Sequence, residues 1–89
     1  MDELYVSKTA RKREALELQG LGQTLAGLKR AQLEALPLPD RLAQALFDYQ
    51  RFTTHEARRR QMEFIGRLMR DLDTSPINEA LATLRGESA

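Results

Sequence analysis

The 89-residue sequence has no cysteine, no tryptophan and a single histidine, His55. Without cysteine there is no disulfide framework, no thiolate nucleophile and no cysteine metal site. One histidine cannot hold a metal ion without partners, and it leaves the serine side chains with only one available base. No glycine-rich phosphate loop is present, because the GLG at 20–22 does not follow a strand pattern. We therefore predict that the protein is not an enzyme and that it binds no cofactor and no metal ion.

Long apolar runs and aromatic residues are also scarce. No segment approaches the ~18 apolar residues of a membrane-spanning helix, so no membrane partner is expected. The polar start, with Asp2 and Glu3, is not typical of a signal peptide, and we expect a cytoplasmic protein. Two tyrosines and three phenylalanines are the only aromatics, so the core must be built mostly from leucine. A small core of this kind gives a net stability on the order of a few kcal/mol, which packing on a partner would increase.

Positive charge is concentrated in two segments of a chain whose net charge is +1. Residues 7–13 contain no acid and four basic residues: Lys8, Arg11, Lys12 and Arg13. Residues 51–70 carry six arginines against Glu56 and Glu63, a balance of 6 − 2 = +4. Two local clusters on a nearly neutral chain indicate a directed contact with an anionic partner.

Proline and glycine divide the sequence into helical segments, and we find no strand pattern. The predicted helices span residues 7–29, 39–72 and 75–85, with a short helical turn at 30–36. We expect one helical domain at 7–86, between a flexible leader (1–6) and a frayed tail (87–89).

The first predicted helix begins after Ser7 as its N-cap. Its leucine seam recurs at the spacing used between packed helices: Leu18, Leu21, Leu25 and Leu28. Because the seam starts only at Leu18, the basic first two turns should project beyond the core. Gly20, Gly22 and Gly27 each weaken a helix by ~1 kcal/mol relative to alanine, which indicates that another helix approaches closely.

The second predicted helix contains one ambiguous segment. Thr53 and Glu56 have the spacing of a capping box, which would begin a new helix here. Neither glycine nor proline interrupts this segment. We therefore favour one continuous helix over 39–72, bent near 53–55.

Residues 56–71 separate arginine from hydrophobic residues around that helix. At about 100° per residue the apolar side chains fill one arc, formed by Met62, Phe64, Ile65, Leu68, Met69 and Leu72. Four arginines gather on the other side: Arg59, Arg60, Arg67 and Arg70. A row of guanidinium groups suits phosphate oxygens, which it pairs with in a planar fork. The alternative is a solvated face with Glu56–Arg60 and Glu63–Arg67 pairs, which is the commoner role of charged runs.

The order and spacing of four segments resemble the DarP (YjgA-like) family of bacterial ribosome maturation proteins. These segments are SK…KRE from Ser7 to Glu14, L..LG..L…K ending at Lys29, L..LPLP..L from Leu33 to Leu42, and RRRQ…IG.LMRD from Arg58 to Asp71. The resemblance covers residues 6–84, although family members generally carry a second helical half of similar length. It implies an all-α fold: an elongated helical hairpin or small bundle of three to four helices, which is half of a larger helical protein. We expect this half to pack on a missing C-terminal half or to self-associate.

The resemblance also implies a ribosome-associated assembly factor. Its expected partners are 23S ribosomal RNA and late precursors of the large (50S) subunit, whose maturation it would promote. The RNA-binding residues would then be the two basic clusters, Lys8, Arg11, Lys12, Arg13, Arg58, Arg59, Arg60, Arg67 and Arg70. His55 is expected to be a polar surface or RNA-contacting group, and the tyrosines to be mainly packing residues. The alternative function is a helical protein–protein interaction module in which the arginines are only solvated.

Overall fold

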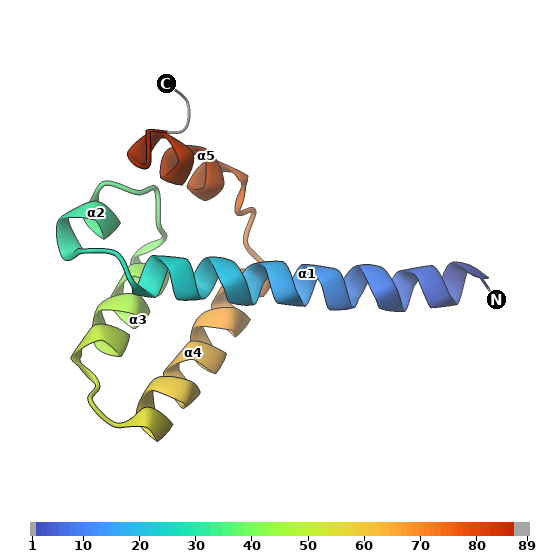
Figure 1. The fold of residues 1–89 in the computed structure, drawn as a ribbon, viewed down its shortest axis with the longest axis horizontal. Coiled ribbons are helices and arrows are strands. Elements are labelled where there is room, and N and C mark those ends of the chain that lie inside the picture. Colours follow the sequence, from blue (N-terminus) through green and yellow to red (C-terminus); the bar gives the residue numbers. More distant parts are fainter. Residues whose placement is uncertain (1, 87–89) are drawn as a thin grey trace.

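The computed structural model describes the backbone of residues 2–86 and the side chains of residues 12–86. This described part is all helical, as the sequence predicted, and contains no strand. The helices are α1 (Asp2–Ala26), α2 (Arg30–Glu34), α3 (Asp40–Arg51), α4 (His55–Arg70) and α5 (Ser75–Leu84). Helices α3 and α4 form an antiparallel hairpin, α1 crosses both of them, and α2 and α5 lie at the far end from the hairpin turn (Figure 1).

Helix α1 differs from its predicted bounds at both ends. It begins at Asp2, so Ser7 lies inside the helix rather than at its N-cap, and residues 2–6 are helical rather than a leader. Acidic residues at Asp2 and Glu3 suit the positive end of the helix dipole, and no proline or glycine follows them before Gly20. The predicted tail, residues 87–89, lies outside the described residues.

The carboxyl end of α1 is set by Gly27 and by a glutamine from α3. The helix stops at Ala26, three residues before the predicted end, and the chain turns at 27–29. Gln50 Nε2 donates to the carbonyl oxygens of Ala26 at 3.1 Å and Leu28 at 2.6 Å. Carbonyl groups at a helix end need donors from elsewhere, and this side chain supplies two such bonds.

The segment predicted as one helix over 39–72 is divided into α3 and α4. Residues 52–54 are not helical, and the N-cap of α4 is Thr54, one residue later than the alternative capping residue Thr53. The Thr54 hydroxyl oxygen accepts a hydrogen bond from the Ala57 amide at 3.2 Å. Threonine is a poor residue inside a helix and a good one at its start. The division lets the two apolar helix faces fold against each other.

The two remaining helices follow the sequence more closely. The turn predicted at 30–36 contains α2, and α5 ends one residue before its predicted end. Pro76 lies in the first turn of α5, where its missing amide proton costs nothing. Gly86 closes this helix with a φ of +75°, a left-handed conformation that glycine adopts readily.

The core takes at least one side chain from every helix. Its buried members are Leu25, Leu33, Leu36, Leu42, Ala45, Leu46, Ile65, Met69, Ile77 and Leu81. The leucine seam of α1 packs here as predicted, with Leu25 fully buried and Leu18, Leu21 and Leu28 half-buried. Both apolar stripes found in the sequence are therefore largely used inside the chain.

Close contact between α1 and α4 depends on Gly22. A Cβ atom at this position would lie 3.3 Å from Met62 Sδ and 3.6 Å from Ile65 Cγ2. The predicted close approach of another helix is thus confirmed at Gly22. A Cβ at Gly20 would meet no atom within 4 Å, so close approach of another helix does not explain the glycine at that position.

The first half of α1 extends away from the other helices as a single rod (Figure 1). With 25 residues the helix is roughly 38 Å long. The radius of gyration of 14.5 Å exceeds the ~12 Å expected for a globule of this chain length. Among the described helices, none combines the length and apolar character needed to cross a membrane.

Candidate nucleic-acid interface

An open groove of about 1080 Å³ lies between α1 and α4. Its α4 wall is formed by one face of that helix, where side chains three and four residues apart are neighbours. Four arginines line it, Arg58, Arg59, Arg67 and Arg70, which we call the groove arginines. With Glu63 on the same wall, the formal charge is 4 − 1 = +3. The groove therefore gathers most of the arginines of the α4 cluster on one side.

Three groove arginines have no internal partner. Arg59, Arg67 and Arg70 form no ion pair and no hydrogen bond with any described residue. The pair predicted between Glu63 and Arg67 is not formed, although both side chains are described. Outside the groove two arginines form ion pairs: Arg51 Nη2 lies 2.7 Å from Asp48 Oδ1, and Arg30 Nε lies 3.4 Å from Glu34 Oε2. The guanidinium groups of these three arginines are therefore available to an external anion without the loss of an internal ion pair.

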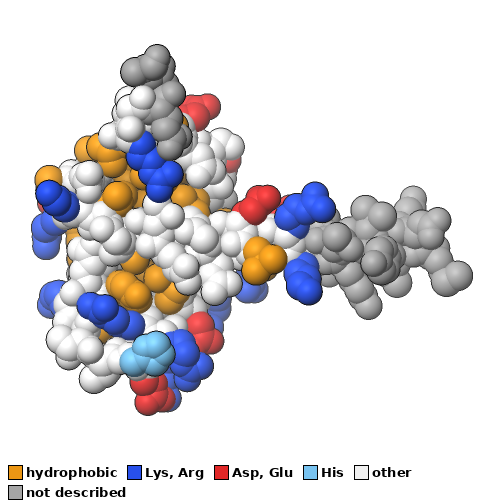
Figure 2. All heavy atoms as spheres, viewed as in Figure 1, with side chains coloured by type: hydrophobic (Ala, Val, Ile, Leu, Met, Phe, Trp, Pro, Cys, Tyr) orange, Lys and Arg blue, Asp and Glu red, His pale blue; other side chains and the backbone are white. Residues whose placement is uncertain are grey.

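The fourth groove arginine, Arg58, is held in place. Its Nε donates to the Phe52 carbonyl oxygen at 2.8 Å, and its guanidinium carbon lies 5.5 Å from the centre of the Tyr49 ring. The carbonyl is in the α3–α4 connection and the ring is on α3, so Arg58 also joins the two helices. Tyr49 and His55 line this end of the groove. In Figure 2 the histidine and several Lys and Arg side chains gather around the hairpin turn.

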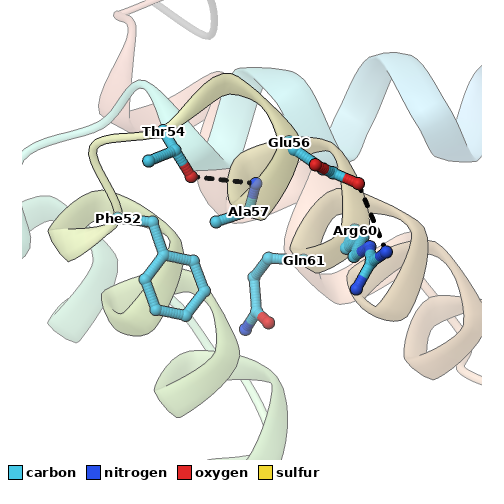
Figure 3. A pocket seen from close by; sticks show the side chains of 6 residues that line it. All are labelled: Phe52, Thr54, Glu56, Ala57, Arg60 and Gln61. Carbon is cyan, nitrogen blue, oxygen red and sulfur yellow. Dashed lines mark hydrogen bonds and ion pairs between the residues drawn. The ribbon is translucent and has the colours of Figure 1, made fainter.

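Arg60 is separated from the other arginines of its helix. It lines a different hollow, together with Phe52 and Gln61, and its Nη2 lies 3.2 Å from Glu56 Oε1 (Figure 3). This ion pair is the one expected from the i, i+4 spacing. Both side chains are exposed, so the pair contributes little to stability. Arg60 was grouped with Arg59 by sequence, and the structure places it outside the groove.

Among the described residues, the α1 wall of the groove carries no charged side chain. It presents the small or apolar residues Ala15, Leu18 and Gly22, and the amides of Gln19 and Gln23. Both glutamines are exposed and neither amide bonds to a described residue. The sequence alone does not single out these two residues, because the pairing of α1 with this face of α4 is a tertiary contact. The only sequence feature they share is their i, i+4 spacing.

The N-terminal basic cluster lies on the extended part of α1. Lys12 and Arg13 are exposed there. The side chains of Lys8 and Arg11 lie outside the described residues. Neither Lys12 nor Arg13 is among the described residues that line the groove.

The acidic side chains that the structure describes do not gather into a metal site, and they limit the basic surface at one end. Within residues 12–86 no group of three or more His, Asp or Glu side chains could hold a metal ion. Arg70 borders a second hollow with Glu14 and Asp73, so the basic surface ends at this acidic edge. The best-defined site for an anionic ligand is therefore the α4 wall of the groove.

Comparison with known proteins identifies the family of the chain. The model of the family described as "Dual-action ribosomal maturation protein DarP" matches residues 4–89. The chain belongs to the DarP family. Proteins of that name from Chromobacterium violaceum and Methylobacillus flagellatus are 49% and 52% identical over 88 and 81 residues. A third, from Vibrio cholerae, is 48% identical over 84 residues.

These matches cover nearly all of the chain and about half of each DarP relative. They include 99%, 91% and 94% of this chain, but 49%, 45% and 43% of the three relatives. The resemblance inferred from the sequence is therefore confirmed at the level of the family.

Proposed function

We propose that this DarP-family chain binds ribosomal RNA of maturing large-subunit particles and promotes their maturation. The observation that carries the proposal is the groove wall of α4, where Arg59, Arg67 and Arg70 have no ion-pair or hydrogen-bond partner among the described side chains. Unpaired guanidinium groups on one rigid helix suit phosphate oxygens, since they need not give up an ion pair on binding. The relatives are named ribosomal maturation proteins, and RNA is the component of a ribosome that is rich in phosphates, which supports RNA as the ligand.

The groove arginines would make the central phosphate contacts, and the other basic residues would contact RNA outside the groove. To bind a phosphate outside the groove, Arg60 would have to break its ion pair with Glu56. The extended half of α1 would bring Lys8, Arg11, Lys12 and Arg13 to RNA farther from the globular part. Two separate basic surfaces would let one small protein contact two neighbouring segments of a folded RNA.

The proposed action is selection among RNA conformations rather than a chemical step. A protein that binds one arrangement of phosphates more tightly than its competitors shifts the population toward that arrangement. The rigid spacing of arginines on a helix provides such a preference for backbone shape. We therefore expect recognition of RNA shape with little reading of individual bases.

The test is binding to precursor large-subunit particles across a salt series, with two matched double variants. Arg59→Ala/Arg67→Ala removes two groove arginines. Arg30→Ala/Arg41→Ala removes the same charge from outside the groove, where these side chains lie over the rings of Phe47 and Phe64. Each phosphate contact contributes about −0.7 to −0.9 to the slope of log K against log salt. The groove variant should lose about 1.4 to 1.8 units of slope and at least about tenfold in affinity at 0.1 M salt.

Three outcomes would count against the proposal in different ways. Equal loss in both double variants would mean that only overall charge matters. Wild-type affinity in the groove variant would move the RNA contacts to the extended half of α1. Binding that is indifferent to salt would indicate the alternative function, a protein–protein interaction module.

A further inference from the structure

We infer that the α1–α4 groove holds a single, unpaired RNA strand, with its phosphates on α4 and its bases against α1. This inference rests on the proposed function and specifies the form of RNA that this site takes. It follows from the unequal charge of the two walls, from the unused amides of α1 and from the open space at Gly66.

The two walls match the two sides of one strand. Counted over the described residues that line the groove, the α4 wall has a formal charge of +3 and the α1 wall has none. A single strand has an anionic sugar–phosphate edge and an uncharged base edge. A duplex presents phosphates on both of its outer edges, so one row would face the neutral α1 wall with no cation opposite it.

The α1 wall is suited to uncharged, hydrogen-bonding groups. The exposed amides of Gln19 and Gln23 can each donate and accept, as base edges and the 2′-hydroxyl require. Leu18 and Ala15 supply apolar surface beside them. Amides of this kind make neutral contacts, which add affinity without releasing counterions.

The length of the α4 wall accommodates several nucleotides. Arg59 and Arg70 are eleven residues apart, which is roughly 16 Å along a helix. A stacked strand advances ~3.4 Å per nucleotide, so several consecutive phosphates fit along this distance. At the Arg58 end the guanidinium carbon lies 5.5 Å from the centre of the Tyr49 ring, and arginine and tyrosine are side chains on which RNA bases stack.

Gly66 leaves room for the strand in the middle of the groove. It lies within α4, where glycine weakens the helix, yet a Cβ built on it would meet no atom within 4 Å. Helix packing inside the chain therefore does not explain this glycine. The absence of a side chain allows a backbone to approach α4 between Met62 and Arg67, as a bound strand would require.

The experiment measures binding of a labelled 12-nucleotide uridine RNA, alone and as one strand of a blunt duplex. The full chain is compared with Gly66→Leu and with the matched control Gly20→Leu. Gly20 is also mid-helix and open but does not line the groove. Both variants replace glycine by a better helix former, so both should remain folded, which far-UV circular dichroism checks.

We expect the wild-type chain to bind the single strand at least about tenfold more tightly than the duplex. Gly66→Leu should abolish that preference, and Gly20→Leu should keep it. A further variant, Gln19→Ala/Gln23→Ala, should weaken single-strand binding severalfold without changing its salt slope, because neutral contacts release no counterions.

The outcomes separate this inference from the proposed function. Equal binding of single strand and duplex, or an unaffected Gly66→Leu variant, would overturn the single-strand site while RNA binding itself remained. Loss of salt slope in the glutamine variant would contradict the placement of phosphates on α4. Failure of the wild-type chain to bind either RNA or precursor particles at low salt would overturn both.

Discussion

At the scale of single residues, two half-buried glutamines join segments far apart in the sequence. Gln50 on α3 bonds to the carbonyl oxygens at the end of α1, and Gln61 Nε2 on α4 donates to the Ala45 carbonyl oxygen at 2.9 Å. Each side chain joins two segments of the chain through hydrogen bonds to backbone carbonyl groups. No spacing rule identifies such residues, because the partner carbonyls come into reach only after the helices pack.

Replacing Gln50 by alanine should destabilise the protein. The change leaves two partly buried carbonyl oxygens without their donor, at a cost of about 1–3 kcal/mol in the free energy of unfolding. Gln44→Ala is the control, because Gln44 bonds only to Asp48 on the exposed face of the same helix. Urea unfolding should show that variant within about 0.5 kcal/mol of wild type. Equal costs for the two variants would refute the role assigned to Gln50.

The arginines show how far residue-level reasoning extends into the candidate site. Helical spacing alone predicted that Arg59, Arg67 and Arg70 share one side of a helix, and they do line one groove. The same reasoning placed Arg60 with them and paired Glu63 with Arg67. The position of Arg60 and the missing Glu63–Arg67 pair have the same cause. A helical projection gives the direction of each Cβ atom, but not the side-chain conformation that determines which neighbour a long arginine contacts.

At the scale of helices, the division between α3 and α4 determines the shape of the molecule. In a continuous helix over 39–72, Leu46 and Ile65 would be about 28 Å apart along the axis. In the hairpin both are fully buried in one core. Burying both apolar faces outweighs the few backbone hydrogen bonds lost at residues 52–54, because each buried large side chain contributes about 1.5–3 kcal/mol.

The start of α4 can be tested with two adjacent threonines. Thr54→Ala removes the hydroxyl that accepts from Ala57 and should cost about 1 kcal/mol in unfolding free energy. Thr53→Ala changes a neighbouring exposed threonine that is not the cap and should be nearly neutral. Thermal unfolding measured on both variants distinguishes them. A larger loss at Thr53 would support the capping residue first suggested by the sequence and contradict the structure.

At the scale of the whole molecule, one small core holds five helices together. Leu46 is 0% exposed near its centre, whereas Leu16 on α1 is 61% exposed. Leu46→Ala should cost about 2–5 kcal/mol, which is comparable with the total stability of so small a domain. Leu16→Ala makes the same chemical change and should shift stability by less than about 0.5 kcal/mol. Far-UV circular dichroism should show substantial unfolding of the first variant only; a folded Leu46→Ala variant would mean that the core is distributed differently.

Local rules were sufficient to predict the helical class, the α2 turn and the packing of the leucine seam in the core. All of these follow from periodicity, proline and glycine, which act within a few residues of the chain. The chain order of four segments was likewise enough to identify the DarP family. Three features could be identified only in the folded molecule: the turn after Arg51, the crossing of α1 over α4 at Gly22, and the uncharged surface of Gln19 and Gln23. These features depend on which apolar helix faces pack against each other. Several pairings are compatible with each segment, and the packing of the whole core determines which pairing has the lowest free energy.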